Sequence, residues 1–116
     1  MTRTEFTVLV SRLLTQMILD GLHPAIDYCK RSDHEQVYLF SQNDPAKHIW
    51  VTADDGVHHI SDHQLGRAVD ILLFNDVGEI VKNWTPNVAN KYHSLWESWG
   101  GKKIIGKDIG HFGVSI

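Results

Sequence analysis

One segment of the chain places histidine and aspartate at a spacing that suits a shared polar site. The segment Ser61–Asp70 reads Ser-Asp-His-Gln-Leu-Gly-Arg-Ala-Val-Asp, with His63 and Asp70 seven positions apart. Residues seven apart share one face of a helix but lie on opposite faces of a regular strand. Gly66 lies between the two and can break a regular backbone. The spacing therefore allows His63 and Asp70 to meet, without proving that they do.

A second segment, Asp108-Ile109-Gly110-His111, could contribute to the same site. A tight turn at Gly110 would bring Asp108 and His111 to one spot. Two histidines and one aspartate on zinc leave a fourth position for water, which is the mark of a catalytic centre. Zinc lowers the pKa of that water to about 7 and polarises the carbonyl under attack. A free carboxylate nearby then takes the water's proton and passes it to the leaving amine.

Together the two segments resemble the zinc peptidases of the M15 family. The pattern Ser-x-His-x-x-Gly-x-Ala-x-Asp is followed about 40 residues later by Asp-x-x-His-Phe. This family includes the VanX- and VanY-type D-alanyl-D-alanine peptidases and the phage endolysins that cut L-alanyl-D-glutamate. Trp99-Gly100-Gly101 is similar to a segment of the endolysin branch. Residues 31–36, Arg-Ser-Asp-His-Glu-Gln, match a further family segment, so that the resemblance runs from about residue 22 to 116.

The resemblance implies a specific role for each matching residue of the two motifs. His63, Asp70 and His111 would bind zinc. Asp108 would act first as the general base and then as the general acid. Aspartate stands here where the D-Ala-D-Ala branch has glutamate, which favours the endolysin branch. The resemblance also implies a hedgehog/DD-peptidase-like fold.

Three more residues receive roles from the resemblance. Arg31 would stabilise the oxyanion on the scissile carbonyl, a task suited to a side chain that is always charged. Ser61 and Trp99 would line the substrate cleft. Gly110 stands where the family often has proline.

Length and composition are those of one globular domain, residues 1–116. The chain has 42% hydrophobic and 22% charged residues, which is ordinary for a globular protein. Its formal net charge of −3 gives no electrostatic support to nucleic-acid binding. Cys29 is the single cysteine, so no intramolecular disulfide and no cysteine-rich zinc ribbon can form.

The sequence also predicts where the chain works. The sequence contains no run of 18 apolar residues, so it predicts no membrane span. The N-terminus does not resemble a signal peptide. We expect a monomer made in the bacterial cytoplasm. It would reach the cell wall after release, as a phage or prophage lysin does.

The elements that must position these residues can be predicted from periodicity. Residues 4–20 form an amphipathic helix that ends at Gly21. A capping-box pattern starts a second helix at Ser32, for which Val37, Tyr38 and Phe40 supply the buried contacts. A short strand is possible at 48–52.

The second half of the chain predicts a hairpin, a helix and a last strand. Residues 68–74 and 79–81 would pair across a turn at 75–78. Thr85 caps a helix with an apolar stripe that ends at Trp99, and His93 falls on its polar, solvated side. The tail 111–116 alternates as a strand, with Phe112, Val114 and Ile116 on one face.

We therefore predict an α+β domain in which a small antiparallel sheet carries a zinc site and helices pack on its other side. The predicted function is zinc-dependent hydrolysis of a peptidoglycan stem peptide, first as an L-alanyl-D-glutamate endopeptidase. The alternatives are a D-Ala-D-Ala carboxypeptidase or dipeptidase, and a non-catalytic zinc-binding cell-wall module. A histidine–metal nuclease is a third class, which the mild negative charge disfavours.

Overall fold

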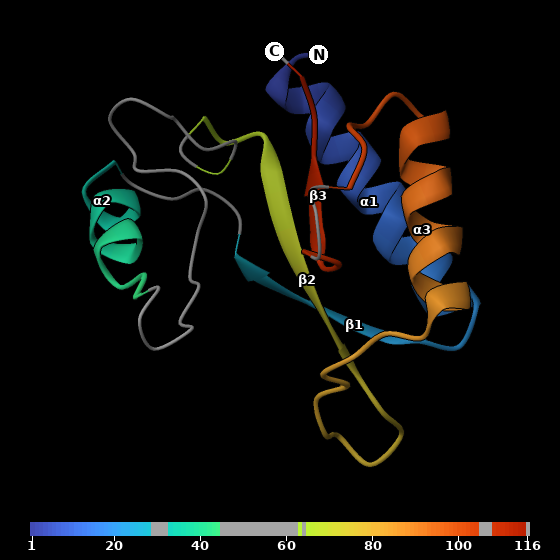
Figure 1. The fold of residues 1–116 in the computed structure, drawn as a ribbon. Helices are drawn as coiled ribbons and strands as arrows, with labels where there is room; N and C mark the ends of the chain where they lie inside the picture. The colour runs from blue at the N-terminus through green and yellow to red at the C-terminus, as the bar shows by residue number, and fades with distance from the viewer. Residues whose placement is uncertain (29–32, 45–62, 64, 105–107, 116) are drawn as a thin grey trace.

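The computed structural model describes residues 1–28, 33–44, 63, 65–104 and 108–115. Helices and strands alternate along the described part of the chain (Figure 1), in the order α1 Arg3–Leu19, β1 His23–Tyr28, α2 Asp33–Ser41, β2 Ala68–Phe74, α3 Pro86–Ser98 and β3 His111–Gly113. The predicted helices and the strand 68–74 are confirmed, and the last strand, predicted over 111–116, is shorter, at 111–113. The possible strand at 48–52 and residue Cys29 lie outside the described residues.

The sheet has three antiparallel strands in the order β1-β2-β3, with β2 in the centre. This confirms an α+β fold with a small antiparallel sheet. Strand β1 was not predicted, because Pro24 interrupts the pattern of a regular strand and alternation is weak there. The expected returning strand 79–81 is reduced to a single bridge between Phe74 and Ile80.

Helix starts follow the capping signals in the sequence. The Thr2 hydroxyl accepts a hydrogen bond from the backbone N–H of Glu5, and the Thr85 hydroxyl accepts one from Val88. Each hydroxyl satisfies a donor that has no partner inside its helix. Pro86 is the first residue of α3, where its missing N–H costs nothing.

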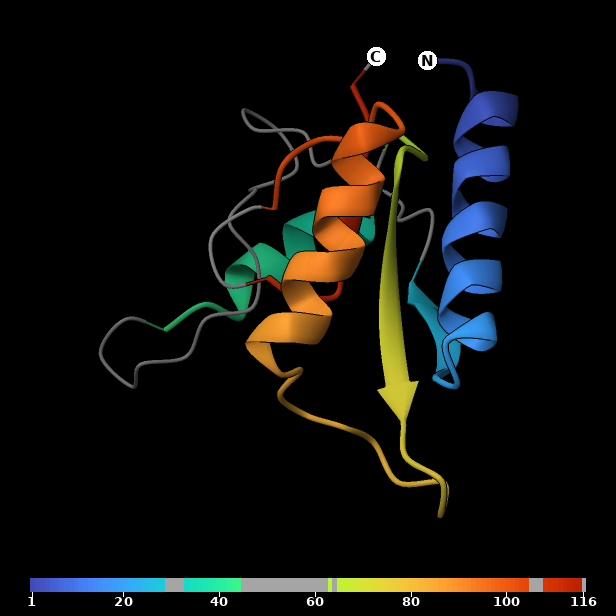
Figure 2. The same cartoon turned by 90° about the vertical axis from the view of Figure 1, so that its right-hand side faces the viewer.

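The core lies between the sheet and the two long helices. Figure 2 shows α1 and α3 side by side against one face of the sheet. Alternate side chains of β2 point into this layer, and Trp96 of α3 lies at its centre, fully buried. Its Nε1 donates a hydrogen bond to the carbonyl of Gly113 over 2.7 Å, which ties α3 to β3. The buried core consists of Phe6, Leu9, Val10, Leu13, Met17, Val69, Ile71, Leu73, Tyr92, Trp96, Phe112 and Val114.

Helix α2 differs from the prediction in position and in burial. It lies on the other side of the sheet from α1 and α3 (Figure 1). The prediction that the helices pack on one face of the sheet therefore holds for α1 and α3 and not for α2. Val37, Tyr38 and Phe40 are 43%, 59% and 40% exposed, and the expectation that they are buried is wrong. Among the described side chains of α2, the buried one is instead the polar Gln36. No helix in the described part of the chain has the length and apolar character needed to cross a membrane.

Candidate metal centre

The register of β2 and β3 determines which side chains face away from the core. Val69 pairs with Phe112, and both are buried in the core. The next pair along the ladder is Asp70 with His111. Because successive side chains of a strand point to opposite faces, Asp70 and His111 share the face that α1 and α3 do not cover.

His63 reaches this pair from the turn that precedes β2. The N–H of Gly66 donates to the carbonyl of His63 over 3.1 Å, which closes the turn. Gly66 has φ +68°, a left-handed conformation that glycine adopts at low cost. The break in regular backbone that the sequence allowed is therefore present, and it brings His63 to the same face as Asp70.

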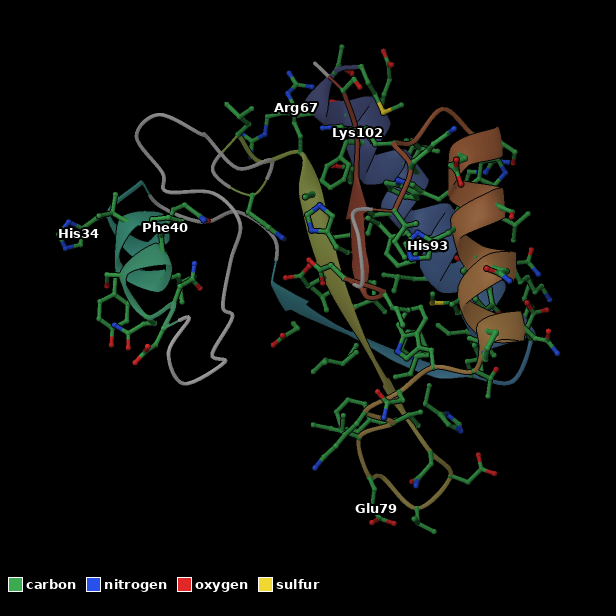
Figure 3. All side chains as sticks on the ribbon, in the orientation of Figure 1. His34, Phe40, Arg67, Glu79, His93 and Lys102 are labelled. Carbon is green, nitrogen blue, oxygen red and sulfur yellow. The ribbon has the colours of Figure 1, made fainter. Side chains whose placement is uncertain are left out.

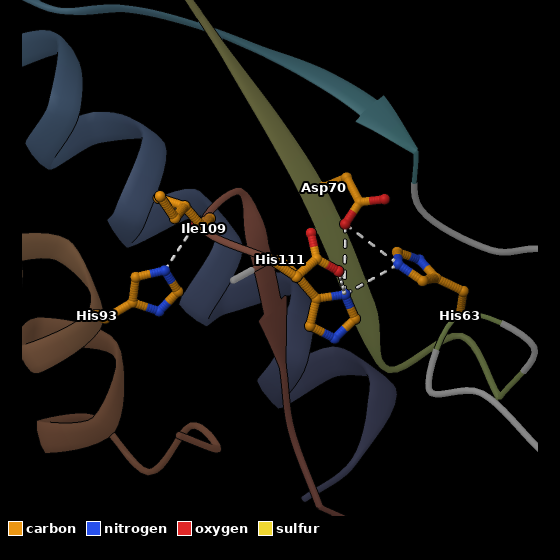
Figure 4. Close-up of polar contacts among 6 residues, drawn as sticks. His63, Asp70, His93, Ile109 and His111 are labelled. Atoms are coloured by element: carbon orange, nitrogen blue, oxygen red, sulfur yellow. Dashed lines mark hydrogen bonds and ion pairs between the residues drawn. The ribbon is translucent and has the colours of Figure 1, made fainter. Parts of the chain in front are cut away.

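The three side chains converge through one atom each (Figure 4). His63 Nε2 lies 3.1 Å from His111 Nδ1 and 3.2 Å from Asp70 Oδ1, and His111 Nδ1 lies 3.3 Å from Asp70 Oδ1. Zinc–ligand bonds of about 2.0–2.1 Å in a tetrahedron put neighbouring ligand atoms about 3.3–3.4 Å apart. The triangle of ligand atoms is therefore close to one face of such a tetrahedron. This group could hold a metal ion.

The electrostatics of the cluster also suit a cation. Burial raises the pKa of Asp70, but the close imidazoles of His111 and His63 lower it more, and the net pKa lies well below its usual range. Asp70 is thus ionised at neutral pH. Its buried Oδ1 has no assigned hydrogen-bond partner, although the two ring nitrogens lie 3.2 and 3.3 Å away. A shared cation would satisfy this oxygen and both ring nitrogens at once.

Asp108 lies beside the cluster without belonging to the triangle. Its Oδ2 is 3.8 Å from His111 Nδ1, and its side chain is 65% exposed. The two residues are joined by a turn in which the N–H of His111 donates to the carbonyl of Asp108 over 3.1 Å. A solvated carboxylate therefore lies next to the ligand atoms, as a proton-transfer group would have to.

Gly110 allows this turn to approach the sheet closely. The N–H of Ile71 donates to the carbonyl of Gly110 over 2.8 Å. A Cβ at Gly110 would lie 2.7 Å from the backbone oxygen of Ile71, which is too close for any other residue without a shift. This contact explains why glycine occupies a position where the family that the sequence resembles often has proline.

His93 supports the same turn, contrary to the prediction that it is solvated. It is 5% exposed, and its Nε2 donates to the carbonyl of Ile109 over 2.6 Å. Its ring stacks on Phe112 with 4.3 Å between ring centroids and 7° between planes. Burial lowers the pKa of His93. Helical spacing could have revealed this position, because His93 lies three residues before the buried Trp96.

The other residues proposed from the resemblance are not part of the triangle. Trp99 lies at the C-terminal end of α3, with the guanidinium of Arg12 4.4 Å from its ring, and is not among the groove-lining residues described below. Arg31 and Ser61 lie outside the described residues. The glycines after Trp99 have structural roles: Gly100 has φ +102°, and a Cβ at Gly101 would collide with the ring of Trp96.

A groove of about 340 Å³ extends from the cluster along the open face of the sheet. Asp27, Asp70 and Asp108 are among its lining residues, and so are Leu72 and the segment 80–84 that follows the β2 turn. Its volume lies within the range of about 300–1,000 Å³ typical of ligand pockets. The candidate metal centre therefore opens onto a surface that can hold a ligand.

A scan against known protein families and a search of curated protein sequences find no match to this chain.

Proposed function

We propose that this chain is a zinc-dependent peptidase that hydrolyses peptidoglycan stem peptides, and that it cuts the L-alanyl-D-glutamate bond. The observation that carries the metal centre is the triangle of His63, Asp70 and His111 ligand atoms, with edges of 3.1–3.3 Å. The choice of peptide bond rests on the sequence resemblance to the M15 endolysins. Fold alone would not support it, since one fold serves many activities.

Ligand type and number suit zinc, and the choice of zinc over non-haem Fe(II), which uses the same donor set, rests on the sequence resemblance. Two imidazoles and one carboxylate are a donor set that zinc uses in catalytic sites with an open fourth position. Bound zinc would supply a water of lowered pKa and an electrophile for the scissile carbonyl. His63 presents Nε2 and His111 presents Nδ1 to the cluster, so with a metal bound the remaining ring proton would lie on Nδ1 of His63 and Nε2 of His111.

Asp108 supplies the proton transfer in this proposal. Its carboxylate is exposed and lies 3.8 Å from a ligand atom, a position from which it would accept a proton from the attacking water. As the C–N bond breaks, the same proton passes to the leaving amine. A site built only for structure would not require this second carboxylate, and the oxyanion role of Arg31 remains part of the proposal.

The test combines metal content with product analysis. We expect about one zinc per purified chain by mass spectrometry. Digestion of purified peptidoglycan should release new L-Ala C-termini and D-Glu N-termini. Release of D-Ala instead would assign the carboxypeptidase reaction, and absence of metal together with absence of hydrolysis after zinc addition would overturn the proposal.

Asp108→Asn separates an enzyme from a zinc-binding module. We expect the variant to keep its zinc and to lose a factor of about 10²–10⁴ in hydrolysis, the usual contribution of a general acid–base group. Asp76→Asn is the matched control, because Asp76 is a fully solvated carboxylate that contacts His23. Equal activity of Asp108→Asn and wild type would exclude the role given to Asp108.

A further inference from the structure

The groove beside the candidate metal centre carries acidic side chains at one end and a lysine at the other. Asp27 directly precedes Tyr28, which pairs with Asp70, and Asp108 contacts His111. The acidic lining residues therefore gather at the end that carries the metal centre. Lys82 is the one cationic side chain among the described lining residues, and it follows Val81, whose N–H donates to the carbonyl of Leu73.

The distance between the two ends can be worked out from the strand that connects them. Asp70 and Leu73 are three residues apart on β2, and a strand rises about 3.3 Å per residue, so Lys82 lies about 10 Å along the sheet from the cluster. Figure 3 shows the direction of this strand, which runs from the end near Arg67 toward the turn that carries Glu79. An extended peptide bound along the groove would cover this distance with about three residues.

The position of Asp108 indicates which half of the substrate occupies the groove. In the proposed function, Asp108 returns its proton to the leaving amine. Asp108 is a lining residue of the groove, so the leaving side of the peptide lies along it. The lining suits a peptide, since Leu72 and Trp84 add apolar surface to its polar residues.

We propose that the groove binds the leaving side of the stem peptide and that Lys82 pairs with a carboxylate on about the third residue after the scissile bond. In a stem tetrapeptide cut after L-Ala, the third residue carries the free C-terminal carboxylate. Lys82 makes no hydrogen bond or ion pair with the described part of the chain, and its flexible stem leaves the ammonium available to a ligand. The enzyme therefore prefers stems that end in a free carboxylate to stems whose C-terminus is blocked. This inference rests on the proposed function.

The test uses two peptides that differ in one group. L-Ala-γ-D-Glu-L-Lys-D-Ala is compared with the same tetrapeptide carrying a C-terminal amide, on wild type, Lys82→Gln and Lys82→Glu. An exposed ion pair contributes up to about 1 kcal/mol, so we expect the wild type to favour the free acid about two- to five-fold in KM with little change in kcat. Lys82→Gln should abolish the preference, and Lys82→Glu should reverse it. Lys103→Gln, an exposed lysine outside the groove, should retain it.

A binding measurement separates this inference from the proposed function. Zinc-loaded Asp108→Asn, with and without Lys82→Gln, is titrated with both peptides by calorimetry. Hydrolysis without a carboxylate preference, or a preference that Lys82→Gln leaves intact, would refute the role of Lys82 while the peptidase stands. A Lys82-dependent preference in binding with no hydrolysis by wild type would support the subsite and overturn the peptidase. Absence of both binding and hydrolysis would overturn both.

Discussion

Replacing His93 by phenylalanine tests whether the hydrogen bond from α3 to the Ile109 carbonyl stabilises the turn that carries Asp108 and His111. Phenylalanine keeps a flat ring to stack on Phe112 but cannot donate to the carbonyl of Ile109. Loss of a donor to a part-buried carbonyl costs about 1–3 kcal/mol in unfolding free energy. For a domain of this size, about 4 °C of melting temperature corresponds to each kcal/mol, so we expect a decrease of about 4–12 °C.

The same change should weaken metal binding, because the turn loses a constraint. Groups that directly orient a metal ligand affect affinity about 10–100-fold, and His93 acts through Ile109 rather than on His111 itself. We therefore expect a smaller loss of metal affinity, about three- to ten-fold, measured by competition with a chromogenic chelator. His93→Gln can still donate to the Ile109 carbonyl and should recover part of the affinity. His23→Phe is the control, since the contact of His23 with Asp76 is exposed.

The stability difference should also depend on pH with a defined sign. Burial lowers the pKa of folded His93 below its ordinary 6.5. The unfolded state therefore binds more protons just below pH 6.5, and this residue's contribution to stability declines as the pH falls through that range. The destabilisation caused by His93→Phe should shrink on acidification. An unchanged melting temperature and zinc affinity in His93→Phe would refute the positioning role.

Three further predictions follow from individual contacts. Gly110→Ala should lower stability by about 1–3 kcal/mol and weaken zinc binding, because its Cβ would lie 2.7 Å from the Ile71 oxygen. Gly78→Ala is the control: its Cβ meets no neighbouring atom, and although the φ of +81° strains the backbone, zinc affinity should be unchanged. Tyr92→Phe should cost about 0.5–1.5 kcal/mol by removing the 2.7 Å hydrogen bond to Asp20. Burial and Asp20 raise the pKa of Tyr92, so wild type but not the variant should lose stability above pH 10 in urea titrations. Zinc at 100 times its Kd should stabilise the protein by about 2.7 kcal/mol in calorimetry, and chelator or His63→Ala should remove the gain.

The sequence predicts the elements with strong periodic or capping signals and fails where tertiary contacts decide. The α3 boundaries follow from Thr85 and Pro86, and β2 follows from its apolar run. Strand β1 carries little signal of its own and owes its conformation to pairing with β2. His93 looks polar in sequence, but a neutral imidazole with a stacking partner and one hydrogen bond is tolerated in the core.

The candidate site could be predicted further than the fold because its residue types are chemically restrictive. The resemblance of two short motifs points to His63, Asp70 and His111, and the structure brings their donor atoms together. The geometry that joins them could not be read from spacing, since a seven-residue interval is ambiguous until Gly66 adopts its positive φ. Lys82 had no sequence signal, because an exposed lysine after a turn acquires meaning only from the groove it borders.

The core and the metal centre depend on the same strand register. Val69 and Phe112 form one pair of the β2–β3 ladder, and Asp70 and His111 form the next. A slip of one residue would turn both ligands into the apolar layer beneath α1 and α3 and expose Val69 and Phe112 on the site face. The free-energy cost of burying Asp70 without a partner would be far larger than any free energy gained by the slipped register. Packing of Phe112 against Trp96 therefore also fixes the direction in which His111 presents its ligand nitrogen, so substitutions in this part of the core should weaken metal binding as well as stability.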